Sequence, residues 1–256
     1  MTRSDRTSIG GDRSRFWTTH WSEIRNARTQ DDVRRRAIID ALVGKYWKPV
    51  YCFLRQKGYS NEAAKDLTQG FFHEIVLGRH LVQQADETKG RFRTFLLTAL
   101  DNYVTSAHRA DVARRRRPKD GIVSLEEFDQ VSMSWAAKDQ KPEELFAYVW
   151  ASVLMDDVLA EVKDGCFRDD KGVHWEVFRD RVLSPIMDGA EPCPITELCD
   201  RFGIKSKAQV SNMIVTVKRR FQVAMNYRIL QHVDSDDEVE QEIQDLMNIL
   251  SRNCAS

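Results

Sequence analysis

The sequence predicts an all-α protein with two helical domains joined by a flexible linker, the C-terminal one containing a helix-turn-helix. Three observations predict this class. Apolar residues recur at helical three- and four-residue spacing along most of the chain. Strand-like alternation never lasts more than a few residues, and we find no internal repeat. A length of 256 residues with 42% hydrophobic residues is enough for two modest cores.

The first domain is predicted over residues 31–118, after an extension at 1–30 that is partly disordered and has a short helix around Trp17 and Trp21. Its first long helix is expected from about Asp31 to Gln56, because Gly58 supplies a stop. The inward side of this helix carries Ile38, Leu42, Tyr46 and Phe53.

A second helix is expected after Ser60, which is a good N-cap residue. A helical wheel centred on Ala64 predicts a buried stripe of Leu67, Thr68, Phe71 and Ile75. The opposite side of the same helix consists of Asp66, Gln69 and His73. These three side chains face either water or a partner protein.

A basic helix is expected from Phe92 to about Arg117, where Pro118 ends it, with Phe92, Phe95, Leu96 and Ala99 buried. The segment 91–119 has eight Arg and Lys against two Asp. This is either a solvated helix face or an electrostatic track for DNA strands, and the neighbouring basic loop favours the track. The candidate DNA contacts are Lys89, Arg91, Arg93, Asn102, Arg109, Arg114, Arg115, Arg116 and Arg117.

A linker over 119–141 precedes the second domain, predicted over 142–232. Pro142 suits the first turn of a helix. One apolar stripe follows it and a second comes later in the domain. The first contains Phe146, Val149, Trp150, Val153 and Leu154, and the second contains Trp175, Phe178 and Val182.

The end of this domain has the pattern of a helix-turn-helix. A short helix buried through Ile195, Leu198, Cys199 and Phe202 is followed by a turn at Gly203. The next helix begins with Ser206-x-x-Gln209, a capping-box pattern, and buries Val210, Ile214, Val217 and Phe221. Residues 205–228 include six Arg and Lys and no acid. Either this is an ordinary helical hairpin, or the second helix reads DNA, through Lys205, Lys207, Ser211, Asn212, Lys218 and Arg219.

The tail at 233–256 combines seven acids between Asp234 and Asp245 with an apolar series of Val239, Ile243, Leu246, Met247 and Leu250. It is either a solubilising helix packed on its own domain, or an acidic helix that competes with DNA near Lys218, Arg219 and Arg220.

Catalysis is not indicated. His73 and His80 are seven residues apart, so they do not match the one-turn spacing of a zinc protease. No catalytic triad or phosphate loop is present, the five cysteines include no Cys-x-x-Cys pair, and no cofactor is implied. We find no signal peptide and no stretch that would span a bilayer, so we expect a cytoplasmic protein without a membrane partner.

The chain resembles bacterial RNA polymerase sigma factors of the extracytoplasmic-function type. Residues 64–72, AKDLTQGFF, are similar to that family's A-x-D-L-x-Q-x-x-F. Residues 92–96, FRTFL, with Thr98, Asn102 and Arg109, are similar to its F-R-x-W-L, T, N and R. The resemblance covers roughly 31–117 and 142–230. The chain departs from the family at Gly70, Phe95, Asp101 and Ser106, where Glu, Trp, Arg and Asp are common.

The resemblance implies a non-catalytic factor that binds core RNA polymerase, directs it to promoters and helps to melt promoter DNA. Asp66 and Gln69, with His73 beside them, would then face the polymerase clamp helices. Residues 92–117 would read the minus-ten element, and the helix from Ser206 would read the minus-thirty-five element. A regulatory or anti-sigma protein is a further expected partner. The alternatives are a helix-turn-helix regulator that acts without polymerase, and an interaction protein that titrates a regulator.

Overall fold

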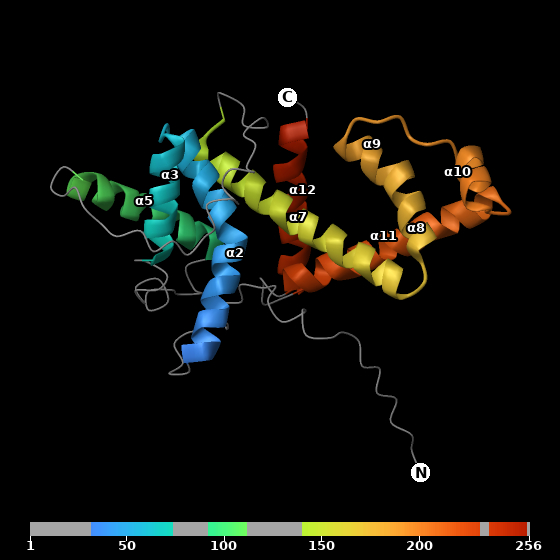
Figure 1. Cartoon of the computed structure of the whole chain (residues 1–256), viewed down its shortest axis with the longest axis horizontal. Helices are drawn as coiled ribbons and strands as arrows, with labels where there is room; N and C mark the ends of the chain where they lie inside the picture. The colour runs from blue at the N-terminus through green and yellow to red at the C-terminus, as the bar shows by residue number, and fades with distance from the viewer. Residues whose placement is uncertain (1–31, 74–91, 112–139, 231–235, 255–256) are drawn as a thin grey trace, which may run out of the picture. The chain divides into compact units, whose positions relative to one another are not determined.

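The computed structural model describes residues 32–73, 92–111, 140–230 and 236–254, and within these ranges it is helical with no strand. The predicted all-α class is therefore confirmed. The predicted N-terminal helix and residues 119–139 of the predicted linker lie outside the described residues. Figure 1 shows the elements, which are α2 (Asp32–Gln56), α3 (Asn61–Phe71), α5 (Phe92–Asp111), α7 (Pro142–Arg168), α8 (Gly172–Phe178), the π-helix η3 (Arg179–Leu183), α9 (Ser184–Met187), α10 (Ile195–Phe202), α11 (Lys207–Leu230) and α12 (Asp236–Cys254).

Contacts between residues divide the chain into two compact units. Unit 1 comprises residues 1–151 and 231–256, and unit 2 comprises residues 152–230. The division falls inside α7, whereas the sequence predicts a boundary at the start of this helix. In unit 1 the first turns of α7 pack on α2, with the rings of Phe53 and Phe146 6.4 Å apart.

The ends of α2 and α3 follow local sequence signals. Gly58 has a φ of 93°, a left-handed conformation that glycine adopts without a Cβ penalty. The amide of Tyr59 donates to the carbonyl of Leu54 at 3.2 Å and closes the end of α2. Ser60 then caps α3, because its Oγ accepts from the amide of Ala63 at 3.3 Å. The predicted stop and N-cap are both confirmed.

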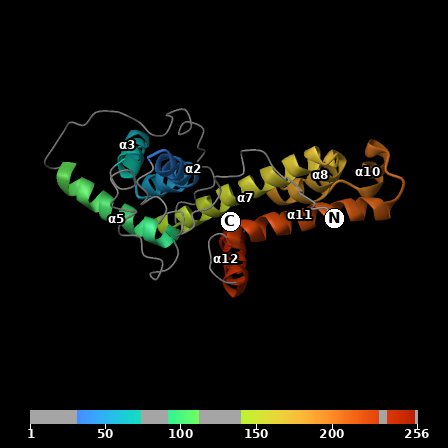
Figure 2. The same ribbon diagram turned by 90° about the horizontal axis from the view of Figure 1, so that it is seen from below.

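The core of unit 1 lies between α2, α3, α5 and the start of α7, and Figure 2 shows α2 and α3 side by side. The rings of Tyr46 and Phe92 lie 5.6 Å apart and join α2 to α5. The buried row of α5 recurs every four residues and consists of Phe92, Leu96, Leu100 and Val104. Phe95 and Ala99, predicted to be buried, are only half-buried. Each lies one residue before a member of the buried row, at its side and not within it.

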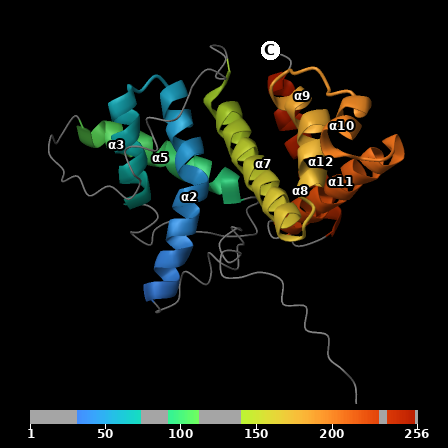
Figure 3. The same ribbon diagram turned by 45° about the vertical axis from the view of Figure 1, so that its right-hand side comes forward.

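Unit 2 is built around α11, against which α8 packs (Figure 3). Its smaller core cluster consists of Val177, Leu198, Ile204 and Val210, each buried. These residues come from α8, α10, the turn after it and α11, so the cluster fixes the position of α10 against the start of α11. No helix in the described ranges is long and apolar enough to cross a membrane.

Candidate protein and nucleic-acid interfaces

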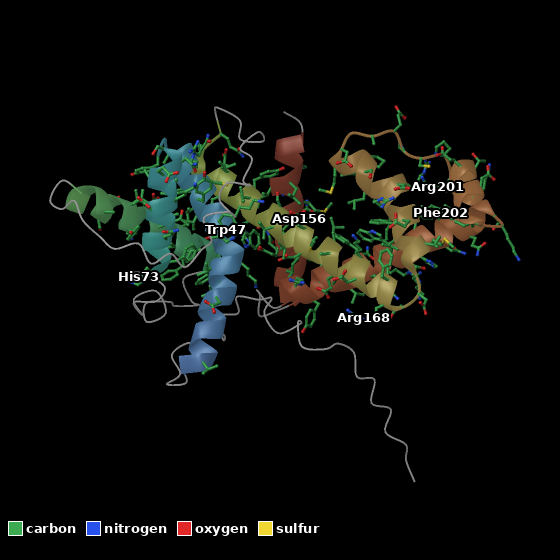
Figure 4. The ribbon with its side chains drawn as sticks, viewed as in Figure 1. Trp47, His73, Asp156, Arg168, Arg201 and Phe202 are labelled. Carbon is green, nitrogen blue, oxygen red and sulfur yellow. The ribbon has the colours of Figure 1, made fainter. Side chains whose placement is uncertain are left out.

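The side of α3 opposite the core is polar and accessible. Asp66 and His73 are exposed and Gln69 is half-buried, and Figure 4 shows His73 just beyond the C-terminal end of α3. The structure therefore keeps the three predicted polymerase contacts on or immediately after one helix.

The buried side of α3 differs in detail from the predicted stripe. Ala64, Thr68 and Phe71 are buried as expected, and Ile75 lies outside the described residues. Leu67 is only half-buried, whereas Lys65 and Phe72 are buried. The buried arc is thus centred near Thr68 instead of Ala64, because α3 packs against both α2 and α5. Lys65 keeps its charge near water by reaching Glu62, at 3.4 Å, whose side chain is 78% exposed.

Gly70 allows α3 and α5 to approach closely. A Cβ placed on Gly70 would lie less than 3.0 Å from the hydroxyl oxygen of Tyr103, closer than real Cβ atoms come to other atoms. The Tyr103 ring also packs edge-on against Phe71, with centroids 5.7 Å apart. The space that a side chain at residue 70 would occupy is therefore filled by Tyr103 from the neighbouring helix α5.

Two of the predicted minus-ten residues have described side chains, and they lie in different surroundings. Asn102 is exposed on α5. The Arg93 side chain is only 13% exposed, because it pairs with Glu242 of α12 and its guanidinium lies 4.5 Å from the centre of the Trp150 ring. Arg109 lies on α5, and the described side chains do not include it. The other predicted contacts, Lys89, Arg91, Arg114, Arg115, Arg116 and Arg117, lie outside the described residues.

Asp101, at a position where the sigma factors that the sequence resembles commonly have Arg, belongs to an ion pair between α5 and the end of α2. Lys57 Nζ, just after α2, donates to its carboxylate at 2.5 Å. The same ammonium lies 4.9 Å from the centre of the Phe53 ring. The acid at residue 101 thus connects α5 to the end of α2.

The connection between α10 and α11 is a tight turn. Gly203 ends α10 with a φ of 64°, and the amide of Ile204 donates to the carbonyl of Cys199 at 2.9 Å. Ser206 Oγ accepts from the amide of Gln209 at 3.2 Å, as the predicted cap requires. Figure 4 labels Arg201 and Phe202 near the end of α10, and the guanidinium of Arg201 lies 4.7 Å from the Phe202 ring centre.

The turn before α11 and the first half of α11 present a surface of mainly polar and basic side chains. All six residues predicted to contact the minus-thirty-five element are exposed, namely Lys205, Lys207, Ser211, Asn212, Lys218 and Arg219. Val210 and Val217 are buried on the opposite side. The structure therefore collects the predicted set on one accessible face.

Two other arginines of α11 belong to internal ion pairs. Arg220 donates to Asp169 at 2.6 Å, and this hydrogen bond holds the pKa of the Asp169 carboxyl below its usual value. Arg228 is buried and donates to Glu161 of α7 at 2.6 and 3.1 Å. Two of the six basic residues counted over 205–228 therefore pair with acids inside unit 2.

Val215 is a surface residue that the sequence reasoning missed. Its side chain is 44% exposed, and a helical wheel places it between Ser211 and Arg219 on the polar face. An apolar group there is able to contact a thymine methyl group in a major groove. The signal that was available in the sequence is a valine in the middle of an otherwise polar wheel sector.

Among the described side chains, no three His, Cys, Asp or Glu come together as a metal site would require. Burial raises the pKa of the Cys52 thiol to about 12, so that thiol is protonated and unreactive near neutral pH.

Neither the family models, the curated proteins nor the solved structures with which the chain was compared include a match.

Proposed function

We propose that this chain is a sigma factor of the extracytoplasmic-function type, which binds core RNA polymerase and directs promoter-specific initiation. One observation carries the proposal. A single chain holds two accessible polar helix faces, one on α3 with Asp66 and one on α11 with Asn212, each opposite a buried apolar side. The α3 face carries residues of the 64–72 motif on which the resemblance to sigma factors depends, and the α11 face belongs to the predicted helix-turn-helix.

In the proposed mechanism the two faces have different partners. The α3 face, with Asp66, Gln69 and His73, docks on the clamp helices of core polymerase. On α11, Lys207, Ser211 and Asn212 lie near the helix start and reach base edges in the major groove. Lys218 and Arg219 lie further along and hold backbone phosphates, which fixes the register of the helix on the duplex.

Melting of the start region is proposed to involve α5. Asn102 is exposed on that helix, and the basic segment that contains it supplies charge for an opened strand. The chain needs no cofactor and performs no chemistry in this mechanism, because the polymerase supplies the catalysis. A factor with these partners works in the cytoplasm.

The decisive experiment mixes the purified full chain with core RNA polymerase and measures co-elution and transcription from a defined start site. Asp66→Lys should weaken polymerase binding by about 2 kcal/mol, or roughly thirtyfold in Kd, as at an interface hot spot. Asp40→Lys is the matched control, since it makes the same charge change at an exposed position of α2. It should leave binding almost unchanged.

Other outcomes would select an alternative or reject the proposal. Specific DNA binding without any co-elution with polymerase would identify a helix-turn-helix regulator. Binding to an anti-sigma protein without polymerase or DNA binding would identify an interaction protein. Equal loss of polymerase binding in Asp66→Lys and Asp40→Lys would show that general charge, and not the α3 face, controls the association.

A further inference from the structure

The buried face of α12 includes a carboxylate. Glu242 is 2% exposed and Leu246, one turn later, is 4% exposed, whereas Glu240 and Gln241 lie at the surface. Met247, which the sequence predicts on the apolar side, is 61% exposed. The buried face of α12 is thus rotated so that Glu242 occupies a position that an amphipathic helix usually gives to an apolar residue.

One partner of this buried acid is Arg93 of α5. Arg93 Nη1 pairs with Glu242 Oε1, and Nη2 donates to Oε2 at 3.4 Å, so two guanidinium nitrogens meet two carboxylate oxygens. The guanidinium also lies over the ring of Trp150, 4.5 Å from its centre. A planar guanidinium presents the same pair of donors to a phosphate group.

The energetics of such a buried ion pair allow Glu242 to be exchanged for another anion on Arg93. Removing two charges from water costs about as much as their attraction returns, so a buried ion pair contributes little net stability. A phosphate that replaces Glu242 would keep Arg93 paired and would return the carboxylate of Glu242 to water. After the exchange, Arg93 is paired with the phosphate and Glu242 is in water, so the exchange need not leave either charge buried without a partner.

We propose that α12 is an internal cap, in which Glu242 takes the place of a DNA backbone phosphate on Arg93. Release of α12 would uncover the Arg93 guanidinium, which lies over the Trp150 ring. A cation beside an aromatic ring suits an unstacked nucleotide of single-stranded DNA. The inference depends on the DNA-binding part of the proposed function. It assigns the acidic tail to the single-strand site around α5, and the predicted competition with Lys218, Arg219 and Arg220 stays a separate prediction.

The test uses the full chain and a fluorescent single-stranded thymidine oligonucleotide, without polymerase. Glu242→Gln should bind this oligonucleotide more tightly than the unmodified chain, by on the order of tenfold, because the cap loses its charge. Glu240→Gln is the matched control, since it removes the same charge from the exposed side of α12. It should change the affinity less than twofold, and adding Arg93→Ala to Glu242→Gln should abolish the gain.

Hydrogen exchange supplies a second readout that does not require a variant. The oligonucleotide should speed exchange of the α12 amides in the unmodified chain, because binding displaces the helix. Equal gains in Glu242→Gln and Glu240→Gln would overturn the inference in favour of general charge repulsion. Binding of the oligonucleotide with unchanged α12 exchange would overturn it in favour of a purely structural helix.

Co-elution with core polymerase, measured on the same preparations, separates this inference from the proposed function. Normal polymerase binding with no gain in Glu242→Gln would reject the cap and leave the sigma-factor proposal standing. A gain in Glu242→Gln without any polymerase binding would reject the sigma-factor proposal and keep the cap. A chain that binds neither polymerase nor the oligonucleotide would reject both.

Discussion

Replacing Gly70 by alanine should destabilise unit 1, although alanine is the better helix former. The residue lies inside α3, where Gly→Ala normally stabilises by about 1 kcal/mol. In this chain the new methyl group would come within 3.0 Å of the Tyr103 hydroxyl oxygen, whereas ordinary contacts begin at 3.4 Å. Overpacking of this kind costs about 1–3 kcal/mol. We expect a net loss of up to about 2 kcal/mol in the free energy of unfolding.

The same structure predicts which second change removes the penalty. Tyr103→Phe deletes the hydroxyl and keeps the ring against Phe71, and the nearest remaining atom, Cζ, is 3.5 Å from the new Cβ. Gly70→Ala in the Tyr103→Phe background should therefore stabilise by up to about 1 kcal/mol. The coupling between the two changes is the quantity of interest, and its expected size is about 1–3 kcal/mol.

Urea unfolding followed by far-ultraviolet circular dichroism measures the four members of this cycle. Gly44→Ala is the matched control, since Gly44 lies inside α2 with nothing within 4 Å of a built Cβ. It should stabilise in both backgrounds by the same amount. If Gly70→Ala stabilises the unmodified chain as much as Gly44→Ala does, the close approach of α3 and α5 is wrong, and with it the orientation of the Asp66 face.

Two further predictions concern unit 2. Asn212→Ala should relax the preference for particular upstream DNA sequences by about 1–3 kcal/mol. Lys218→Ala with Arg219→Ala should instead weaken binding to all DNA sequences alike, and should lower the slope of log affinity against log salt concentration by about 2. Equal salt slopes in these variants would contradict the assigned roles. Gly203→Ala should lower the free energy of unfolding by about 1–2 kcal/mol, since its left-handed φ of 64° strains any L side chain. Thermal unfolding measures this loss, with Gly165→Ala in the interior of α7 as a control that should show none.

Features set by a few neighbouring residues could be predicted from the sequence. Gly58 and Gly203 end their helices with left-handed conformations, and Ser60 and Ser206 cap the following ones, as their residue types predict. Pro142 begins α7, as expected for a residue whose missing amide proton costs nothing in the first turn. Short-range hydrogen bonding and backbone sterics decide these positions, so their surroundings in the fold matter little.

Features that depend on residues far apart in the chain could not be predicted. Arg93 and Glu242 are separated by 149 positions, and local charge alone assigned one to DNA contacts and the other to an acidic tail with no link to α5. The wheel for α3 misplaced Leu67 and Lys65, because a wheel centred on one alanine cannot show that two other helices flank α3. Which basic residues of α11 are used internally likewise depends on acids of α7 and of the turn after it, such as Asp169, that periodicity does not reveal.

Two residues that depart from the sigma-factor pattern, Gly70 and Asp101, are each matched by a neighbouring side chain inside unit 1. Gly70 leaves room for Tyr103, and Asp101 receives the ammonium of Lys57. A glutamate at residue 70 would bring its Cβ within 3.0 Å of the Tyr103 hydroxyl, so this tyrosine would have to shift to make room for the usual acid. The α3 face consequently lacks the acid that sigma factors usually have next to Gln69. It keeps two exposed acids, Asp66 and, one turn earlier, Glu62, which pairs with Lys65. In the proposed complex with polymerase, Asp66→Lys reverses one of these two charges and leaves Glu62 in place, so a loss of docking reports on the position of Asp66 itself.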